Sequence, residues 1–318
     1  MSYTIGQGSN IGGSFNLTQQ SFELIEQGVY DVKYPEIHWT QMLEQASVKT
    51  DAPIGSRQYS SMLKDQTGMG AFVNGAGENV PTVDVGVGKI TVPIEMAAVS
   101  AVITDDEARM VQFGHSMSMM TEKGNAMRLA SERHIERTFF FGNEKLGFNA
   151  FINYPGVDIM TAGSKAAGGT AWADATADEM MKDMNDAMTR IANDTRSIAL
   201  AGHIILPTSA YYRLGTVRIE ATGKSALEYF VDNNVYTLST GQQLEITGLP
   251  YLEDAAADGS GRMTVKVKSV QNDCLPMPQT LTLKAPQEQG LLTKVYGTYE
   301  VGSYLNRFPK EMIYMDGL

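Results

Sequence analysis

Residues 54–103 show the alternation of β-strands but supply almost no apolar core of their own. Six glycines lie between residues 64 and 88. The apolar positions of the strand that follows are Ile90, Val92, Ile94 and Met96. This pattern predicts two strands joined by a glycine-rich tip, which together make a long hairpin. A lone two-stranded hairpin is only marginally stable in water, so something else must cover it, and a neighbouring copy of the chain is one candidate.

The apolar side of this hairpin stem is the expected contact surface between copies. We expect it to pack on the body of an adjacent copy, together with residues nearer the tip. The expected contact residues are Ile90, Val92, Ile94, Met96, Phe72 and Lys64. Pro93 lies in the same stretch and has no N–H to donate to a ladder, so its strand is expected at the edge of a sheet.

A long helix is predicted directly after the hairpin. Residues 104–107 form a capping box, in which Thr104 caps the helix and Glu107 reaches back to it. The apolar stripe that follows keeps helical spacing. Its members are Met110, Phe113, Met117, Met120, Met127, Ile135 and Phe139. Residues 115–141 alone would span roughly 40 Å as a helix, and Gly142 is the expected C-terminal stop.

A compact segment of mixed helices and strands is predicted next. A second capping box at residues 176–179 opens a helix with methionines on one side. Residues 203–207 read as a short buried strand, and a helix is expected from Thr208 to Leu214. Further expected strands are 244–246 and 263–267.

Charge and composition exclude several classes of protein. The 318 residues include 25 Lys+Arg and 36 Asp+Glu, a formal net charge of -11 at pH 7. This acidic balance argues against a protein whose main task is to grip phosphate backbones. The single cysteine, Cys274, excludes an internal disulfide framework and a four-cysteine zinc site. It fits assembly in a reducing cytosol. No apolar run approaches the ~18 residues of a membrane span.

The sequence offers almost no catalytic chemistry. None of the four histidines lies four residues from another, so no zinc-protease pattern is present. Gly223-Lys224-Ser225 resembles the end of a phosphate loop, but Arg218 stands where the first glycine is needed. Cys274 reads as a buried thiol rather than a nucleophile. We therefore predict no catalytic residue, no cofactor and no metal site, and a protein that is not an enzyme.

The order of these segments resembles that of a known family. The stretches that carry the likeness are residues 103–107, 132–143, 147–157 and 203–212. Together they resemble major capsid proteins of tailed bacteriophages, which have the Hong Kong 97-like capsid fold. The resemblance implies an α+β fold with an N-terminal arm, an extended β-hairpin loop, a peripheral domain with a long spine helix, and an axial α/β domain.

The resemblance also implies a division of the chain and a set of partners. The expected parts are 1–53 (N-terminal arm and lead-in), 54–97 (extended hairpin loop), 98–150 with 280–318 (peripheral domain) and 151–279 (axial domain). The implied function is self-assembly into an icosahedral shell around double-stranded DNA. The implied partners are other copies, as hexamers and pentamers, then scaffold, portal and decoration proteins, and packaged DNA contacted without sequence preference, with no membrane. The implied location is the virion capsid, assembled in the bacterial host cytoplasm.

Two alternatives stay open at this point. One shares the fold: an encapsulin-type nanocompartment, whose shell holds an enzyme instead of DNA. The other belongs to a different class: a cytosolic enzyme with an unrecognised site. Assembly into large particles would favour the phage capsid or the nanocompartment over the cytosolic enzyme.

Overall fold

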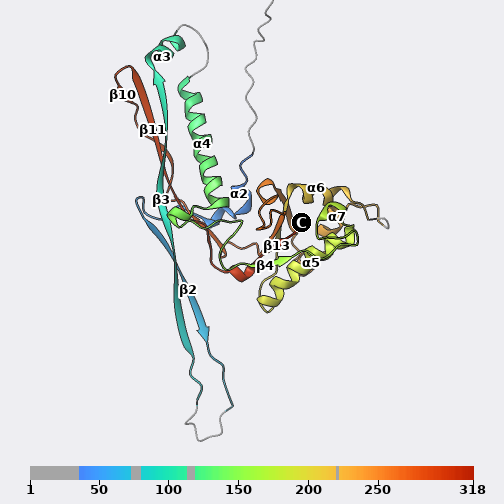
Figure 1. Cartoon of the computed structure of the whole chain (residues 1–318). Coiled ribbons are helices and arrows are strands. Elements are labelled where there is room, and N and C mark those ends of the chain that lie inside the picture. Colours follow the sequence, from blue (N-terminus) through green and yellow to red (C-terminus); the bar gives the residue numbers. More distant parts are fainter. Residues whose placement is uncertain (1–35, 73–79, 113–118, 220–221) are drawn as a thin grey trace, which may run out of the picture. The chain divides into compact units, whose positions relative to one another are not determined.

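Three β-sheets organise the part of the chain that the computed structural model describes, which is residues 36–72, 80–112, 119–219 and 222–318 (Figure 1). Everything below concerns the unit from Ile37 to Leu318. Most of the expected N-terminal arm, residues 1–53, lies outside the described residues, as does the tip segment 73–79.

The first sheet contains the expected hairpin. Strand β3 (Asp84–Thr104) pairs antiparallel with β2 (Gln58–Thr67) as far as Pro93, and then with β11 (Leu292–Gly302) from Ile94 onward. The strands β9 (Gln279–Leu283) and β10 (Gln287–Gln289) pair with β11. Each half of β3 therefore has a partner strand on one side only. The expectation that this strand lies at the edge of its sheet is wrong in the strand order, because β3 lies between β11 and β2. Pro93 lies where one partner strand gives way to the other, so its missing N–H interrupts neither ladder.

Two helices follow β3. The capping box is present: the Glu107 N–H donates to Thr104 Oγ1 (3.2 Å), and the Thr104 N–H donates to Glu107 Oε2 (3.0 Å). Helix α3 (Asp105–Gln112) starts there, and α4 (Met119–Phe141) is the expected spine helix. It ends at Gly142, whose φ of 64° is in the left-handed region. A Cβ at this position would lie 2.4 Å from the carbonyl oxygen of Phe148, so only glycine fits this turn.

One of the hydrophobic cores lies around the C-terminal end of α4. Phe139 and Phe140 are fully buried, and the ring of Phe139 stacks on that of Phe151 with 5.0 Å between centroids. Tyr304 closes this aromatic cluster edge-on. The short helix α2 (Trp39–Met42) packs against the same core.

The third sheet carries the compact α/β segment. Its strand order is β4 (Asp158–Thr161), β13 (Met312–Asp316), β7 (Arg262–Lys266), β5 (His203–Pro207) and β6 (Glu245–Leu249). Its helices are α5 (Ala177–Asp194), α6 (Thr208–Thr216), α7 (Ala226–Asp232) and α8 (Val235–Thr240). The capping box of Thr176 and Glu179 opens α5 as expected. Apolar side chains of α5 and of β5, β7 and β13 fill the main core.

The pairing of β13 corrects one expected boundary. Residues 312–316 were expected in the peripheral domain with the rest of 280–318, but β13 hydrogen-bonds to β7 and β4. The last strand therefore belongs to the sheet of the expected axial segment. Strand pairing between residues far apart in sequence leaves no local signal, so periodicity does not reveal it.

The second sheet, made of three short strands, supports the hairpin stem. Strand β8 (Asp273–Pro276) pairs with β1 (Val48–Lys49) and β12 (Leu305–Asn306). Cys274 and Leu305 from these strands pack against Val92 of the stem. The 3-10 turns among the described residues are η1 (Gln45–Ser47), η2 (Glu144–Leu146), η3 (Trp172–Asp174), η4 (Pro250–Leu252) and η5 (Pro309–Glu311).

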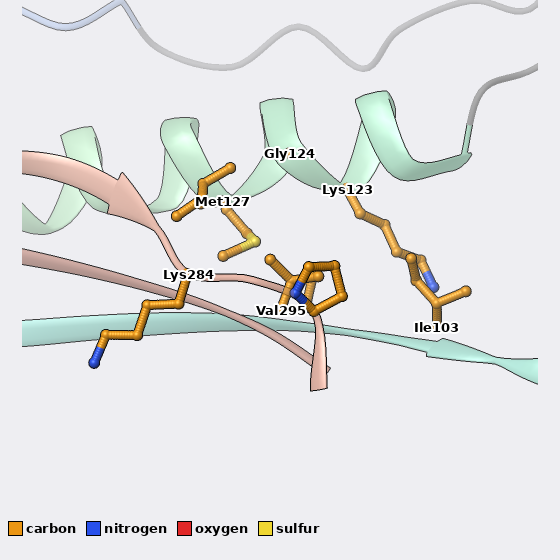
Figure 2. Close-up of a pocket in the computed structure, with 9 residues that line it drawn as sticks. Ile103, Lys123, Gly124, Met127, Lys284 and Val295 are labelled. Carbon is orange, nitrogen blue, oxygen red and sulfur yellow. The ribbon is translucent and has the colours of Figure 1, made fainter. Parts of the chain in front are cut away.

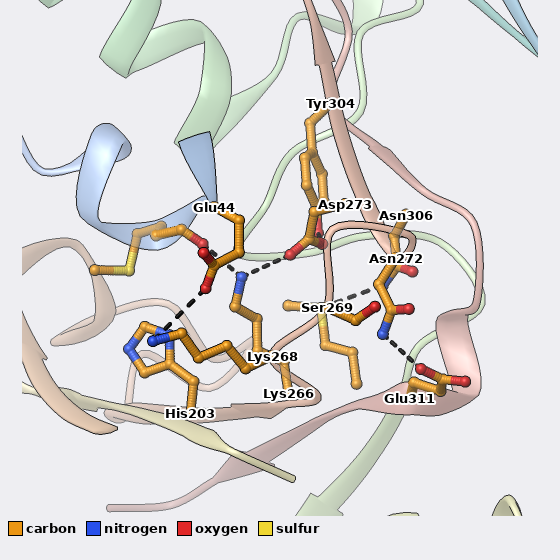
Figure 3. Close-up of polar contacts among 12 residues, drawn as sticks. Glu44, His203, Lys266, Lys268, Ser269, Asn272, Asp273, Tyr304, Asn306 and Glu311 are labelled. Atoms are coloured by element: carbon orange, nitrogen blue, oxygen red, sulfur yellow. Dashed lines mark hydrogen bonds and ion pairs between the residues drawn. The ribbon is translucent and has the colours of Figure 1, made fainter. Parts of the chain in front are cut away.

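A buried polar network fixes β8 in place (Figure 3). Lys266 Nζ of β7 lies 2.6 Å from Asp273 Oδ2 of β8 and also donates to the carbonyl of Met42. The hydroxyl of Tyr304 donates to the other carboxylate oxygen, Asp273 Oδ1, at 2.5 Å. The network links the segment before the hairpin, the third sheet and the strand that supports the stem.

Candidate assembly surfaces

The outer part of the hairpin has no cover within the described chain. Every described residue from 64 to 72 and from 80 to 89 is exposed. Many of these residues are apolar, which is costly for a surface that stays in water. The exposed large apolar residues of β2, of the outer part of β3 and of the segments flanking the tip are Met62, Met69, Phe72, Val80, Val83, Val85 and Val87.

The register of the two strands gathers part of this apolar surface on one side. Val85 lies opposite Gln66, Val87 opposite Lys64, and Lys89 opposite Met62. Cross-strand partners share a face of the sheet, and side chains alternate between faces along a strand. Met62, Val85 and Val87 therefore share one face, each with a polar residue opposite (Lys89, Gln66 and Lys64), and these three apolar residues are 74, 50 and 66% exposed. We call these three residues the valine face.

The face expected from the sequence is the opposite one, and it requires a correction. Val92 and Ile94 are only 2% and 1% exposed, so they are buried within their own chain. Val92 packs on Cys274 and Leu305, and Ile90 is partly buried against the same cluster. These side chains stabilise the hairpin stem and are not available to a second copy. Of the expected contact residues, Met96, Phe72 and Lys64 are exposed.

The sequence contains an alternation that indicates the valine face. Val83, Val85 and Val87 alternate at odd positions, whereas Ile90, Val92 and Ile94 alternate at even positions. The apolar side of the strand thus changes at Gly88-Lys89, where the buried stem gives way to the exposed arm.

Polar contacts hold the base of the hairpin to the body. Arg307 Nε donates to Ser61 Oγ of β2 at 2.7 Å, and Arg307 Nη1 donates to the carbonyl of Gln271 at 2.9 Å. Burial raises the pKa of the neighbouring Cys274 thiol. A buried thiol with a raised pKa is a poor nucleophile, so Cys274 acts here as a packing residue.

A pocket of about 240 Å³ lies between α4 and the first sheet (Figure 2). Gly124 of α4 leaves space there, since no atom lies within 4 Å of where its Cβ would be. Lys123 at one end donates to Glu107 Oε2 (2.8 Å) and to the carbonyl of Val102 (2.6 Å). The other lining residues are Ala101, Ile103, Met127, Leu283, Lys284, Pro286 and Val295. This mostly apolar lining suits packing and offers no acid–base pair.

The described histidines have structural partners. His203 Nε2 lies 2.9 Å from Thr247 Oγ1, and burial, with Lys266 and Lys268 nearby, lowers the pKa of His203 to about 3. His134 Nδ1 contacts the hydroxyl of Tyr299 at 2.8 Å. Among the described residues, no three His, Cys, Asp or Glu side chains form a group that could hold a metal ion. In the same part of the chain, no helix is long and apolar enough to cross a membrane.

Comparison with known proteins bears on the family and the fold of the chain. The family model described as "Major capsid protein" matches residues 68–318. No curated protein shows detectable sequence similarity to the chain.

Solved structures share the fold at low sequence identity. The capsid of Myoviridae phage XM1 superposes with a TM-score of 0.76 at 13% identity, covering 100% of both chains. The capsid of an empty GTA particle gives 0.62 at 11% identity and covers 99% of both chains. A structure from Mycobacterium phage Ogopogo gives 0.58 at 12% identity, covering 94% of this chain and 98% of that one.

Proposed function

This chain belongs to the major capsid protein family, and from that premise we propose that it closes into an icosahedral shell around the double-stranded DNA of a tailed phage. In this shell the valine face of each hairpin packs on an adjacent copy. The observation that carries the proposal is the uncovered hairpin: its outer residues are exposed, yet Met62, Val85 and Val87 are apolar. Contacts between copies would remove this surface from water. Phe72 and Lys64, near the tip, are further contact residues in this proposal.

In the proposed shell, the remainder of each chain forms the contacts between adjacent copies. The expected hexamers and pentamers place the α/β segment near the capsomer centre and the sheet with α4 at the periphery. Residues 312–318 go with the α/β segment in this division, because β13 pairs there. The partners that we propose beyond other copies are scaffold, portal and decoration proteins, and assembly takes place in the cytoplasm of the bacterial host.

The acidic balance of the chain supports a shell whose inner wall does not hold the packaged DNA tightly. With a net charge of -11, the subunit has no cationic excess to hold a phosphate backbone. Packaged DNA would therefore touch the inner wall without sequence preference. Membership of a family of structural proteins favours this reading over an enzyme with an unrecognised site.

Shortening the hairpin tests the proposal. Replacing residues 66–87 with a two-residue turn removes exposed segments and few buried contacts, so the subunit should keep its thermal unfolding transition. Shell formation should fail, because each copy loses contacts both as donor and as acceptor of the hairpin. Circular dichroism follows the fold, and electron microscopy follows the assembly. A shortened chain that still closes into normal shells contradicts the proposal.

A further inference from the structure

Part of strand β3 has one edge without a partner strand in the described chain, and this edge is separate from the valine face. The directions of the hydrogen bonds near Pro93 show which edge it is. The Ile94 N–H donates to the carbonyl of Arg57 (2.9 Å), on the side of β2. The carbonyl of Pro93 accepts from the Ser303 N–H (3.0 Å), on the side of β11. Backbone groups of successive residues in a strand point to opposite edges. Even-numbered residues of β3 therefore direct their N–H and C=O groups to the edge that β2 occupies.

Beyond Arg57 that edge has no partner strand in the described chain. β2 begins at Gln58, and β11 covers only the other edge from Ile94 to Thr104. The residues whose backbone groups face the open edge are Met96, Ala98, Ser100 and Val102. Among the described residues, the one hydrogen bond that reaches these groups is from Lys123 Nζ to the carbonyl of Val102.

Apart from Lys123 at the carbonyl of Val102, the open edge lacks the devices that keep sheet edges apart in the described chain. Exposed edge strands are normally protected by charged side chains, prolines or bulges. Residues 96–102 read Met-Ala-Ala-Val-Ser-Ala-Val, with no charge and no proline. The outer arm of the hairpin, by contrast, carries Lys64 on β2 and Lys89 on β3. An unprotected edge of seven residues is a template for another strand.

We propose that this edge pairs with the same edge of a second copy, antiparallel and about a two-fold axis at Val99. Ala98 then faces Ser100 of the second copy, and Met96 faces its Val102. The small side chains at the centre allow the close approach that a β-ladder needs. The proposal rests on the proposed function, since it concerns a contact between assembled copies.

Charges at the two ends of the edge support this choice of partner. Glu95 lies at one end, in an exposed ion pair with Arg57 (3.2 Å). Lys123 lies at the other end, beside Val102. Lys123 is itself paired with Glu107 (2.8 Å), so each end of the edge carries one cation and one anion. Antiparallel pairing sets the Arg57–Glu95 pair of one copy beside the Lys123–Glu107 pair of the other, and no like charges are left to face each other alone. A closed shell contains two-fold axes, which is where a contact of a surface with itself belongs.

Cysteine cross-linking tests the register. In the variant Ala98→Cys/Ser100→Cys, each new thiol faces one of the second copy, with Cα atoms about 5.5 Å apart, within disulfide range. The native Cys274 is buried and does not interfere. After mild oxidation of assembled particles, covalent dimers should be the main band on a non-reducing gel. The matched control Met96→Cys/Ser100→Cys places no two thiols opposite each other and should stay monomeric on the gel.

A blocking variant gives a second readout. Ser100→Pro removes an N–H that faces the open edge and leaves the ladder to β11 intact, so the subunit should keep its melting transition while closed shells are lost. Ser100→Ala should assemble normally. Assembled particles without linked dimers, or normal shells from Ser100→Pro, overturn the inference and leave the proposed function standing. Disulfides between Ala98→Cys and Val87→Cys chains would assign the edge to a hairpin instead. A chain that never assembles contradicts both proposals.

Discussion

Lys266 and Asp273 form a buried ion pair, with 2.6 Å between Nζ and Oδ2 and side chains only 6% and 5% exposed. Asp273 directly precedes Cys274, which packs on Val92 of the hairpin stem. Burial and the Asp273 carboxylate raise the pKa of Tyr304 well above its usual value, so its hydroxyl remains a donor to that carboxylate. The pair thus fixes the strand against which the stem rests.

Removing one partner of this pair should destabilise the subunit strongly. Lys266→Met keeps the chain length but leaves the Asp273 charge buried without a partner, and we expect a loss of about 3–5 kcal/mol in the free energy of unfolding. Lys268→Met is the control, because its pair with Glu245 is exposed and should contribute no more than about 1 kcal/mol. Urea unfolding of monomeric subunits measures both. Equal losses for the two variants would show that the buried pair has no special role.

The two faces of β3 should respond in opposite ways to substitution. Val85→Ser with Val87→Ser changes exposed side chains, so stability should stay within about 0.5 kcal/mol while shell assembly fails. Val92→Ala opens the buried stem and should cost about 1–3 kcal/mol, yet subunits that remain folded should still assemble. Thermal melts and electron microscopy separate the two effects. Normal shells from the double serine variant would count against the valine face.

The turn that ends α4 should tolerate no side chain at Gly142. Gly142→Ala combines a positive φ with a contact of 2.4 Å between the new Cβ and the carbonyl oxygen of Phe148. We expect the free energy of unfolding, measured by urea unfolding, to fall by about 3 kcal/mol. Gly168→Ala is the control: its φ is 95°, but nothing lies within 4 Å of the new methyl group, so about 1 kcal/mol should be lost. A smaller loss at Gly142 than at Gly168 would contradict this account of the helix end.

Stability should fall as the pH is lowered below neutrality, partly through His203. Its pKa is about 3 in the folded chain against 6.5 normally, so the unfolded chain binds a proton in this range that the folded chain does not. The free energy of unfolding therefore decreases from about pH 6.5 toward pH 3, by roughly 2–3 kcal/mol at pH 4.5 from this residue.

The variant His203→Gln isolates that contribution. It should show a shallower decrease in the free energy of unfolding between pH 7.5 and pH 4.5, measured by urea unfolding. An unchanged slope would mean that His203 is protonated in the folded chain.

Local signals carried the sequence-based predictions that the structure confirms. The capping boxes at Thr104 and Thr176, the stop at Gly142 and the strand at residues 203–207 depend on neighbouring residues only, and all are present. The hairpin was also predictable, because its alternation and glycines lie in one stretch.

Contacts between distant residues account for what the sequence did not reveal. The alternation of Ile90, Val92 and Ile94 indicates a covered face but not what covers it. For Ile90 and Val92 the cover is Cys274 and Leu305 of the same chain, far away in sequence, instead of a second copy. The pairing of β13 with β7 and β4 is equally non-local. The exposed valines at odd positions then became visible as the candidate assembly surface.

Electron microscopy of the purified full-length chain is the most direct test of the central claim that this subunit builds a shell through its uncovered hairpin. The account predicts closed shells or large arrays of capsomers, whether the chain is expressed alone or together with the scaffold protein that we propose as a partner. Particles of monomer size alone, over a wide range of protein and salt concentration and also with the scaffold present, would contradict it.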